Sequence, residues 1–572
     1  MMLWHIGNTT VRSPFRLRDG LIAIKEAGLE NRLRGSEEKE KYLCKILSEF
    51  GVVSLKSDET FSIGRKWRSA MEKLGFIIPY NTRLPLSFYK KYGKFDSISP
   101  NGRRLIEAES VSAWQECFLR ALIVYKFIYN QDQTVKTSDG CETIFKVQKG
   151  FYPFKHTLSV MARLRDVTGE SKISIYEMAL FIQCSSDEDD IESIVGQIIS
   201  FRNEIKSTLN KKQVYAKHVD TVAKCHKKAI GTFMDYADTN FRYLKATGLF
   251  TSKGDGIAFS ADKFLLVEEL IQHRFDLIKE DYYVALVNGA ELPTDDYIVA
   301  KNILMSLIHI LSEYGYEYDL SKKTLHSTAD INVVRHEVEE LISQYRELDY
   351  ADKQIEYAEE IEGYIDLLLD RKKRSLTLST GVEIKIPSSD APAYFEWVIW
   401  RLFLAINSLT NKPWEARRFK IDQDFLPVNC APGNGPDLIF EYDDMVLVVE
   451  VTFTTSSRQE AAEGEPVRRH VAQYAEKYAE TSKRVYGLFI AISIDTNTAN
   501  TFRLGEWYLK DDRKIGLHIV PVNLKSFKKF TFSSLSQKDI LAKLKVYMME
   551  CRMNAIMDAP EWKDKICNVF EQ

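Results

Sequence analysis

The sequence predicts a multidomain α+β protein, in which mainly helical domains precede a C-terminal α/β domain with a mixed β-sheet. At 572 residues the chain is too long for one hydrophobic core, so three or four domains are expected. Amphipathic helical patterns dominate the first two thirds, whereas runs rich in β-branched and aromatic residues gather after residue 437. The expected domains are 1–125, 126–300, a helical linker at 301–377, and 378–572.

The composition is that of an ordinary soluble protein, with 45% apolar and 28% charged residues. No secretory segment opens the chain, and no apolar run approaches the roughly 20 residues that span a bilayer. The eight cysteines are scattered without C-x-x-C spacing, so neither a zinc site nor a disulfide framework is indicated. We therefore expect a protein of the reducing cytoplasm, without a membrane partner.

The charge is unevenly distributed along the chain. The overall charge is −3, but residues 1–104 carry 20 Lys and Arg against 11 Asp and Glu. A basic end of this kind indicates a surface that faces nucleic acid. The alternative is an ordinary solvated basic surface.

The first basic region has the order of elements of a winged helix-turn-helix. Helices are expected over 37–50 and 62–74, the second ended by Gly75, followed by apolar residues 76–78 and the segment 98–106 as a strand and wing. In such modules the second helix enters the major groove. The alternative is a small helical subdomain with a basic face. Candidate DNA contacts here are Arg65, Lys66, Arg68, Arg103 and Arg104.

A second, weaker echo of this module follows. A helix over 236–247, ended by Gly248, precedes the wing-like turn Gly254-Asp255-Gly256. Asn240, Arg242 and Lys245 on this helix are candidate DNA contacts. Residues 110–210 are expected to be mainly helical, and helices such as 334–348 and 357–369 would form a connector.

The most informative stretch is 437–452, which predicts two strands joined by the two-residue turn Asp443-Asp444. Pairing outward from this turn places Asp437 directly opposite Glu450. Like charges on directly opposed residues repel, and two buried carboxylates are costly unless a positive group lies between them. A hard divalent cation, above all Mg²⁺, would satisfy them. The alternative is that Asp437 is a turn residue and Glu450 a satisfied core carboxylate.

The arrangement Pro436-Asp437…Glu450-Val451-Thr452 resembles the active-site hairpin of PD-(D/E)xK nucleases. The resemblance implies that Asp437 and Glu450 hold Mg²⁺, which activates water and stabilises charge on the phosphate. Thr452 stands where that family has a lysine, which leaves open the group that assists the attacking water. Together with the segments 463–470 and 7–16, this hairpin closely resembles the AlwI/MlyI/BstNBI group of type IIS restriction and nicking endonucleases.

This resemblance implies further site residues. Glu396, on a strongly apolar helix expected over 391–408, matches an acidic position before the hairpin, or else compensates the helix N-terminus. His470, on a helix from Pro466 to about residue 478, would orient water or contact the scissile phosphate, although a lone helical His is usually structural. Either Glu463 or Glu465 would supply a third carboxylate. Strands at 487–494 and 516–522 and a closing helix at 539–549 would complete the restriction-endonuclease-like domain.

Near the N-terminus, composition alone indicates an ordinary tail. The family resemblance makes it a DNA contact, because arginine forks suit phosphate and guanine and Asn or Thr can hydrogen-bond bases. The candidate contacts are Asn8, Thr9, Thr10, Arg12, Arg16 and Arg18.

The sequence therefore predicts an Mg²⁺-dependent enzyme of the prokaryotic cytoplasm. It would recognise a short asymmetric duplex sequence and cut a short distance outside it. One nuclease constellation cuts one strand, so cutting both strands needs a second protomer or a small nuclease subunit, and a cognate DNA methyltransferase would protect the host. The alternatives are a non-catalytic winged-helix DNA-binding protein with a degenerate nuclease-like domain, and a repair nuclease that ignores base sequence.

Overall fold

The computed structural model describes most of the chain, and the statements below refer to that part. The described residues are 2–34, 36–53, 61–82, 84–136, 142–272, 281–373, 375–387, 390–535 and 539–572. The chain folds into two compact units, Met1–Ile342 and Ser343–Gln572. The boundary falls within one long helix, α15 (Thr328–Asp352). No helix in the described ranges has both the length and the apolar character needed to cross a lipid bilayer.

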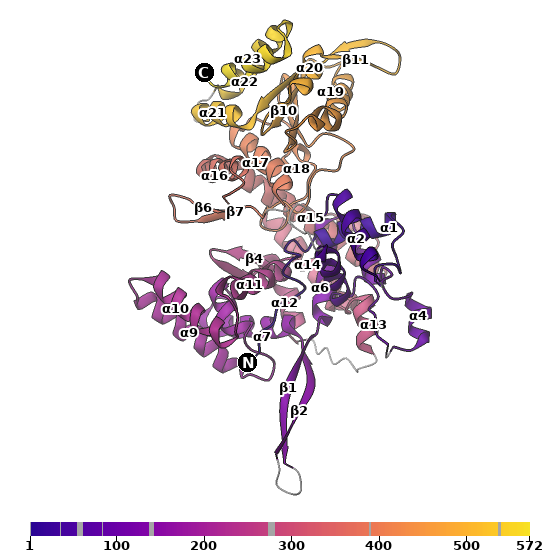
Figure 1. Cartoon of the computed structure of the whole chain (residues 1–572), viewed down its shortest axis with the longest axis vertical. Helices are drawn as coiled ribbons and strands as arrows, with labels where there is room; N and C mark the ends of the chain where they lie inside the picture. The colour runs from indigo at the N-terminus through magenta and orange to yellow at the C-terminus, as the bar shows by residue number, and fades with distance from the viewer. Residues whose placement is uncertain are drawn as a thin grey trace. The chain divides into compact units, whose positions relative to one another are not determined.

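The first unit is dominated by helices (Figure 1). Its first helices are α1 (Arg16–Glu26), α2 (Glu37–Glu49), α3 (Ser62–Lys73), α4 (Leu86–Tyr92), α5 (Pro100–Glu107) and α6 (Val111–Val124). These are followed by α7 (Pro153–Thr168), α8 (Ile175–Glu177), η1 (Met178–Ile182), α9 (Ile191–Ser207), α10 (Lys211–Cys225) and α11 (Ile230–Lys245). The last are η2 (Ala261–Lys263), α12 (Phe264–Gln272), α13 (Asp281–Asn288), η3 (Pro293–Asp295), α14 (Tyr297–Glu313) and η4 (Leu320–Lys322).

The segment expected to form the first wing is a helix instead. Only a single antiparallel bridge, Ile77 to Ile98, pairs the two apolar segments, and α5 begins directly after it. Ser99 caps this helix by accepting a hydrogen bond from the Gly102 amide at 3.0 Å, and Pro100 occupies its first turn. A Ser N-cap followed by Pro is a strong helix start, which explains why the chain does not continue as a strand.

Residues 110–210 are mainly helical, as expected, but they also contain a pair of long strands. Strands β1 (Phe127–Lys136) and β2 (Glu142–Phe151) pair antiparallel over ten positions, from Phe127↔Phe151 to Lys136↔Glu142. Figure 1 shows them as a long two-stranded arm leading away from the helices of the first unit.

The hairpin expected after the second module is present. Strands β4 (Phe250–Lys253) and β5 (Gly256–Phe259) follow α11 and pair antiparallel, and β3 (Ile173–Ser174) adds to β5, giving the order β3-β5-β4. Gly254 has a φ of +60°, which suits the tight turn between the two strands. The assignment of either module to a winged helix stays a prediction.

The second unit is built on a four-stranded mixed sheet of order β13-β10-β9-β8. Strand β10 is parallel to β9 and β13, whereas β8 is antiparallel to β9, which confirms the expected mixed sheet. Its strands are β6 (Ser375–Thr377), β7 (Glu383–Lys385), β8 (Leu438–Glu441), β9 (Met445–Thr452), β10 (Arg484–Ala491), β11 (Glu506–Tyr508), β12 (Lys514–Gly516) and β13 (Ile519–Asn523). Its helical segments are η5 (Gln354–Tyr357), α16 (Ala358–Leu369), α17 (Ala391–Ile406), α18 (Pro413–Ala416), η6 (Glu460–Gly464), α19 (Glu465–Lys477), α20 (Thr496–Leu504), α21 (Leu524–Ser534), α22 (Ile540–Met553), η7 (Asn554–Ile556) and α23 (Ala559–Phe570).

The core of this unit surrounds α17, whose side chains are buried on nearly every side. An all-round apolar helix of this kind belongs in a protein interior. Helix α16 contributes Ile361 and Ile365 to the same core, so the compact unit begins before the expected boundary at residue 378. The helix expected at 539–549 is present as α22, but it does not close the domain, because a second amphipathic helix, α23, follows it and buries Trp562 and Phe570.

Candidate active site

The β8–β9 hairpin places two carboxylates face to face. Its register pairs Phe440 with Leu447 and Leu438 with Val449, and the next step outward sets Asp437 opposite Glu450. The amide of Tyr442 donates to the Met445 carbonyl at 2.8 Å, which closes the predicted two-residue turn. The Val451 amide donates to Oδ2 of Asp437 at 2.9 Å, so the strand backbone holds this carboxyl in place.

Glu450 lies in the interior of the sheet. Strand β9 is paired on both edges, by β8 and by β10, where Phe489 is the partner of Glu450. The Glu450 residue is only 7% exposed in a strand that is otherwise Val-rich. An ionised carboxylate in such surroundings is costly unless a cation or hydrogen-bond donor compensates it.

Four carboxyl groups influence one another at this point of the fold. Burial raises the pKa of Glu396 well above its ordinary range, and the charge of Asp437 raises it further. Burial likewise raises the pKa of Asp437 well above its ordinary range, with a further contribution from the charge of Glu450. Burial, with the charges of Glu463 and Glu396, raises the pKa of Glu450 to about 8. Burial also raises the pKa of Glu463. Such mutual repulsion disfavours full ionisation and is relieved by a bound cation.

His470 joins this cluster from helix α19. Its Nδ1 shares a 2.6 Å hydrogen bond with Oε1 of Glu450, and the residue is 3% exposed. Burial, with the positive charges of Arg469 and Arg418, lowers the pKa of His470 to about 4. The imidazole ring is therefore neutral at neutral pH, and a single proton lies between Nδ1 of His470 and Oε1 of Glu450. Its Nε2 is buried without a hydrogen-bond partner in the described part of the chain, which leaves one ring nitrogen available.

Glu396 and a loop before β8 complete the surroundings. Oε2 of Glu396 accepts a hydrogen bond from the Ala431 amide at 2.7 Å. Arg418 holds the following loop by donating to the carbonyls of Pro432 and Pro436, both at 3.2 Å. A Cβ on Gly435 would lie 2.3 Å from Nη1 of Arg418, so a larger residue there would displace this guanidinium from the loop. Arg418 was not among the predicted residues, because nothing in its local sequence indicates which loop it holds.

The structure separates the two candidates for a third carboxylate. Glu463 lies in η6, and the Thr452 side chain forms a hydrogen bond with its carboxyl group that lowers its pKa, against the larger effect of burial. The carboxyl of Glu465 accepts a hydrogen bond from Nε of Arg469 at 3.0 Å, and its side chain is 60% exposed. Glu463 thus belongs to the carboxyl cluster, whereas Glu465 pairs at the surface of α19.

The donor chemistry of this cluster fits a hard divalent cation. Asp437 and Glu450 present oxygen atoms, and Mg²⁺ is commonly held by one or two carboxylates, with waters and substrate phosphate oxygens completing its shell. Among the residues that the structure describes, no three Asp, Glu, His or Cys side chains form a ready-made metal shell. The protein side of such a site would therefore be the Asp437–Glu450 pair.

The N-terminal candidates mostly stabilise the first unit. Arg12 pairs with Asp235 at 2.9 Å, and Arg16 donates to the Gly51 carbonyl at 2.6 Å. Arg18 donates to the carbonyls of Leu105 and Ile106, at the end of α5. The Thr10 amide donates to Oδ1 of Asn8 at 3.0 Å, and the Thr9 carbonyl accepts from Arg12, so these residues form a local turn.

The candidates of the two modules divide into buried and exposed. Asn240 is fully buried and accepts a hydrogen bond from the Ile6 amide at 2.8 Å, which removes it as a DNA contact. Arg65 is exposed on α3, and Lys66 is half-buried. The remaining side chains have protein partners, namely Arg68 with Glu40, Arg103 with Glu30, Arg104 with Asn101 and the Asn288 carbonyl, Arg242 with Asp238, and Lys245 with Ser252.

Comparison with known proteins gives a family match. The family model described as AlwI restriction endonuclease matches residues 72–530. No curated protein matches the chain. One solved structure that matches is the small subunit of the heterodimeric restriction endonuclease R.BspD6I, with 22% sequence identity and a TM-score of 0.28. The match covers 36% of this chain and 96% of the small-subunit chain.

Proposed function

The chain belongs to the AlwI restriction endonuclease family, and from that premise we propose that it is a type IIS or nicking endonuclease. It would recognise a short asymmetric duplex sequence and hydrolyse a phosphodiester bond outside that sequence with Mg²⁺. The observation that supports this most is the opposition of Asp437 and Glu450, with Glu396, Glu463 and His470 around them. The family accounts for DNA as the substrate, and this cluster accounts for the chemistry.

Asp437 and Glu450 would hold the cation, which supplies a Lewis acid for the phosphate and for the attacking water. Both carboxyls must lose their protons for this role, and their raised pKa values make that step dependent on pH. An ionised Glu450 accepts the Nδ1 proton of His470 in the 2.6 Å hydrogen bond. This fixes the tautomer in which Nε2 carries a free lone pair.

The free Nε2 of His470 is the candidate acceptor for the proton of water. In this scheme the water oxygen bonds to phosphorus while the bond from phosphorus to the leaving oxygen breaks, and the water proton passes to Nε2. Glu463 lies beside Thr452, the position of the missing lysine, and would accept a hydrogen bond from the same water. Of these two groups, Glu463 is the better matched to proton transfer near neutral pH, because burial raises its pKa, whereas that of His470 is lowered to about 4.

The test is cleavage of supercoiled plasmid by the wild type and by Asp437→Asn, with and without Mg²⁺. This substitution keeps the size of the side chain and its acceptor for the Val451 amide, so folding is preserved. Discrete products made only by the wild type and only with metal would support the proposal. Persistent open circles indicate a nickase, full-length linear DNA indicates paired protomers that cut both strands, and a smear indicates a nuclease without sequence preference. DNA binding without cleavage by either protein would contradict the catalytic role.

A further inference from the structure

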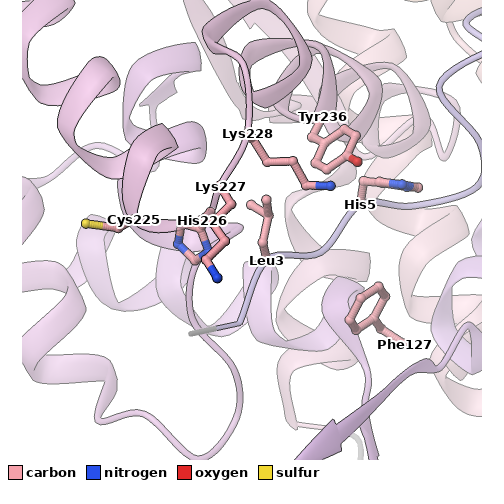
Figure 2. A pocket seen from close by; sticks show the side chains of 8 residues that line it. All are labelled: Leu3, His5, Phe127, Cys225, His226, Lys227, Lys228 and Tyr236. Atoms are coloured by element: carbon pink, nitrogen blue, oxygen red, sulfur yellow. The ribbon is translucent and has the colours of Figure 1, made fainter.

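A cavity of about 380 Å³ lies in the first unit, apart from the carboxyl cluster. It is lined by the N-terminal segment, the start of β1, the turn after α10, and helix α11 (Figure 2). The lining residues are Leu3, His5, Phe127, Cys225, His226, Lys227, Lys228 and Tyr236. None of these eight is acidic, and four carry basic side chains.

Two of the basic side chains, His5 and Lys228, lie against the aromatic ring of Tyr236. The rings of His5 and Tyr236 pack edge to face, with centroids 4.4 Å apart. The Lys228 ammonium lies 5.9 Å from the centre of the Tyr236 ring, and Figure 2 shows it directed towards His5. Lys227 and Lys228 are exposed, so a ligand that enters the cavity from solvent meets both ammonium groups.

His5, which lines this cavity, has one ring nitrogen without a hydrogen-bond partner in the part of the chain that the structure describes. Its Nδ1 is buried and has no hydrogen-bond partner among the described residues. Burial, with the positive charges of Lys73 and Lys228, lowers the pKa of His5 to about 4. A neutral His with an unpartnered nitrogen beside a lysine can donate a hydrogen bond to an anion, and the anion in turn offsets the lysine charges.

The surrounding sequence is strongly basic. Residues 206–228, which contain α10, carry seven lysines and one acidic residue, Asp220. Asp220 is already paired, since Lys224 donates to it at 2.6 Å. Helix α11 begins two residues after Lys228, and no side chain caps its N-terminus. The positive end of the helix dipole therefore adds to the same positive field.

From the cavity, its basic lining and the unpartnered His5, we propose that this is a binding site for a phosphodiester group of the DNA backbone. The proposal rests on the proposed function, because a DNA-cutting enzyme supplies the polyanion. Lys227, Lys228 and His5 would contact the phosphate oxygens, and Leu3 and Phe127 would contact the flanking sugar carbons. Phosphate contacts position a protein on DNA without reading its sequence, so the site would fix the register of the first unit on the duplex.

The test compares three variants with the wild type in binding to a fluorescent 30-base-pair duplex of random sequence, in EDTA. K227Q/K228Q removes both charges, K227R/K228R keeps them, and K525Q/K529Q removes two exposed charges from α21 as a matched control. A plot of the logarithm of the binding constant against the logarithm of the salt concentration is a falling line, and its slope steepens by about 0.9 for each phosphate that the protein neutralises. We expect K227Q/K228Q to lower this slope by about 1, the value for one phosphate, and the other two variants to match the wild type.

A second arm separates the DNA backbone from a free anion. Broadening of the ³¹P resonance of inorganic phosphate measures binding of the free ion by wild type and K227Q/K228Q. Equal salt slopes for all four proteins overturn the proposal while the proposed function stands. This holds even if K227Q/K228Q alone loses binding of inorganic phosphate, because the cavity would then bind a free anion and not the DNA backbone. Failure of the wild type itself to bind any duplex would instead count against the proposed function.

Discussion

Replacing Glu450 by Gln is expected to stabilise the metal-free second unit, with a gain that grows with pH. Burial is the main cause of the rise in the pKa of Glu450 from 4.5 to about 8. The folded protein therefore keeps this proton at pH values where the unfolded chain has lost it. The resulting contribution to stability is complete below about pH 4.5 and is lost as the pH rises through 8. Gln resembles the protonated carboxyl in shape but does not titrate.

The magnitude follows from the difference between the solution pH and the unfolded-state pKa of 4.5. At pH 7 this difference is about 2.5 units, which at 1.36 kcal/mol per unit corresponds to about 3 kcal/mol. In a unit of this size, 1 kcal/mol moves Tm by roughly 2–4 °C. The second unit of E450Q should thus melt up to roughly 6–12 °C higher than the wild type at pH 7, and roughly 2 °C higher at pH 5. This is an upper limit, because Asp437 shares the proton.

Scanning calorimetry in EDTA at the two pH values measures this difference. Glu465→Gln is the matched control, because Glu465 is an exposed carboxylate in the same unit. Adding Mg²⁺ at pH 7 should raise the Tm of the wild type and leave E450Q nearly unchanged, since the cation needs both ionised carboxylates. A variant that is less stable than the wild type at both pH values, or an equal Mg²⁺ effect on both proteins, would refute the reasoning.

Three further substitutions test other parts of the structure. Glu463→Gln should reduce plasmid cleavage by at least tenfold whereas Glu465→Gln should leave it within about twofold, and the reverse order would show that the surface carboxylate acts instead. Gly435→Ala should push the Arg418 guanidinium, 2.3 Å from the new methyl group, off the carbonyls of Pro432 and Pro436. The loop before Asp437 should then loosen, and Mg²⁺ should stabilise the second unit less in calorimetry. In the first unit, Glu116→Gln should lower stability by about 3 kcal/mol, because it leaves the buried Arg335 without one of its carboxylates; urea unfolding of the first unit measures this, and an unchanged midpoint would contradict it.

The hairpin was predictable because its information is local. A two-residue turn between two apolar strands fixes the register, and the register alone places Asp437 opposite Glu450. The body of α19 was predictable as well, since Pro466 lies in its first turn. Its start was not: the segment expected to be a polar loop up to Gly464 contains η6, which continues into α19 with Gly464 itself in the right-handed helical conformation. Turns between buried strands and prolines in first helical turns can be recognised from a few neighbouring residues.

The features that were not predicted have both distant and local causes. Asn240 resembled an exposed recognition residue, but the Ile6 amide, 234 positions earlier, buries it as an internal acceptor. The arm of β1 and β2 was missed because its sequence, with Asn130, Gln131 and Asp132 in succession, lacks an alternation of apolar and polar residues. The helix α5 was a different failure, since the Ser99-Pro100 start signal was present in the sequence and was read as part of a wing.

The charge balance of the carboxyl cluster has a consequence for how the enzyme would engage DNA. Thr452 replaces the usual lysine, His470 is neutral, and Arg418 is occupied by the loop before β8. Without a cation, the protein therefore offers the scissile phosphate four carboxyl groups and little positive charge, and at high pH their ionisation repels it. Binding energy for the duplex must then come from elsewhere, and the basic cavity of the first unit is a source that does not depend on metal. On this reasoning, chelating Mg²⁺ should abolish cleavage while leaving salt-dependent binding to duplex DNA largely intact.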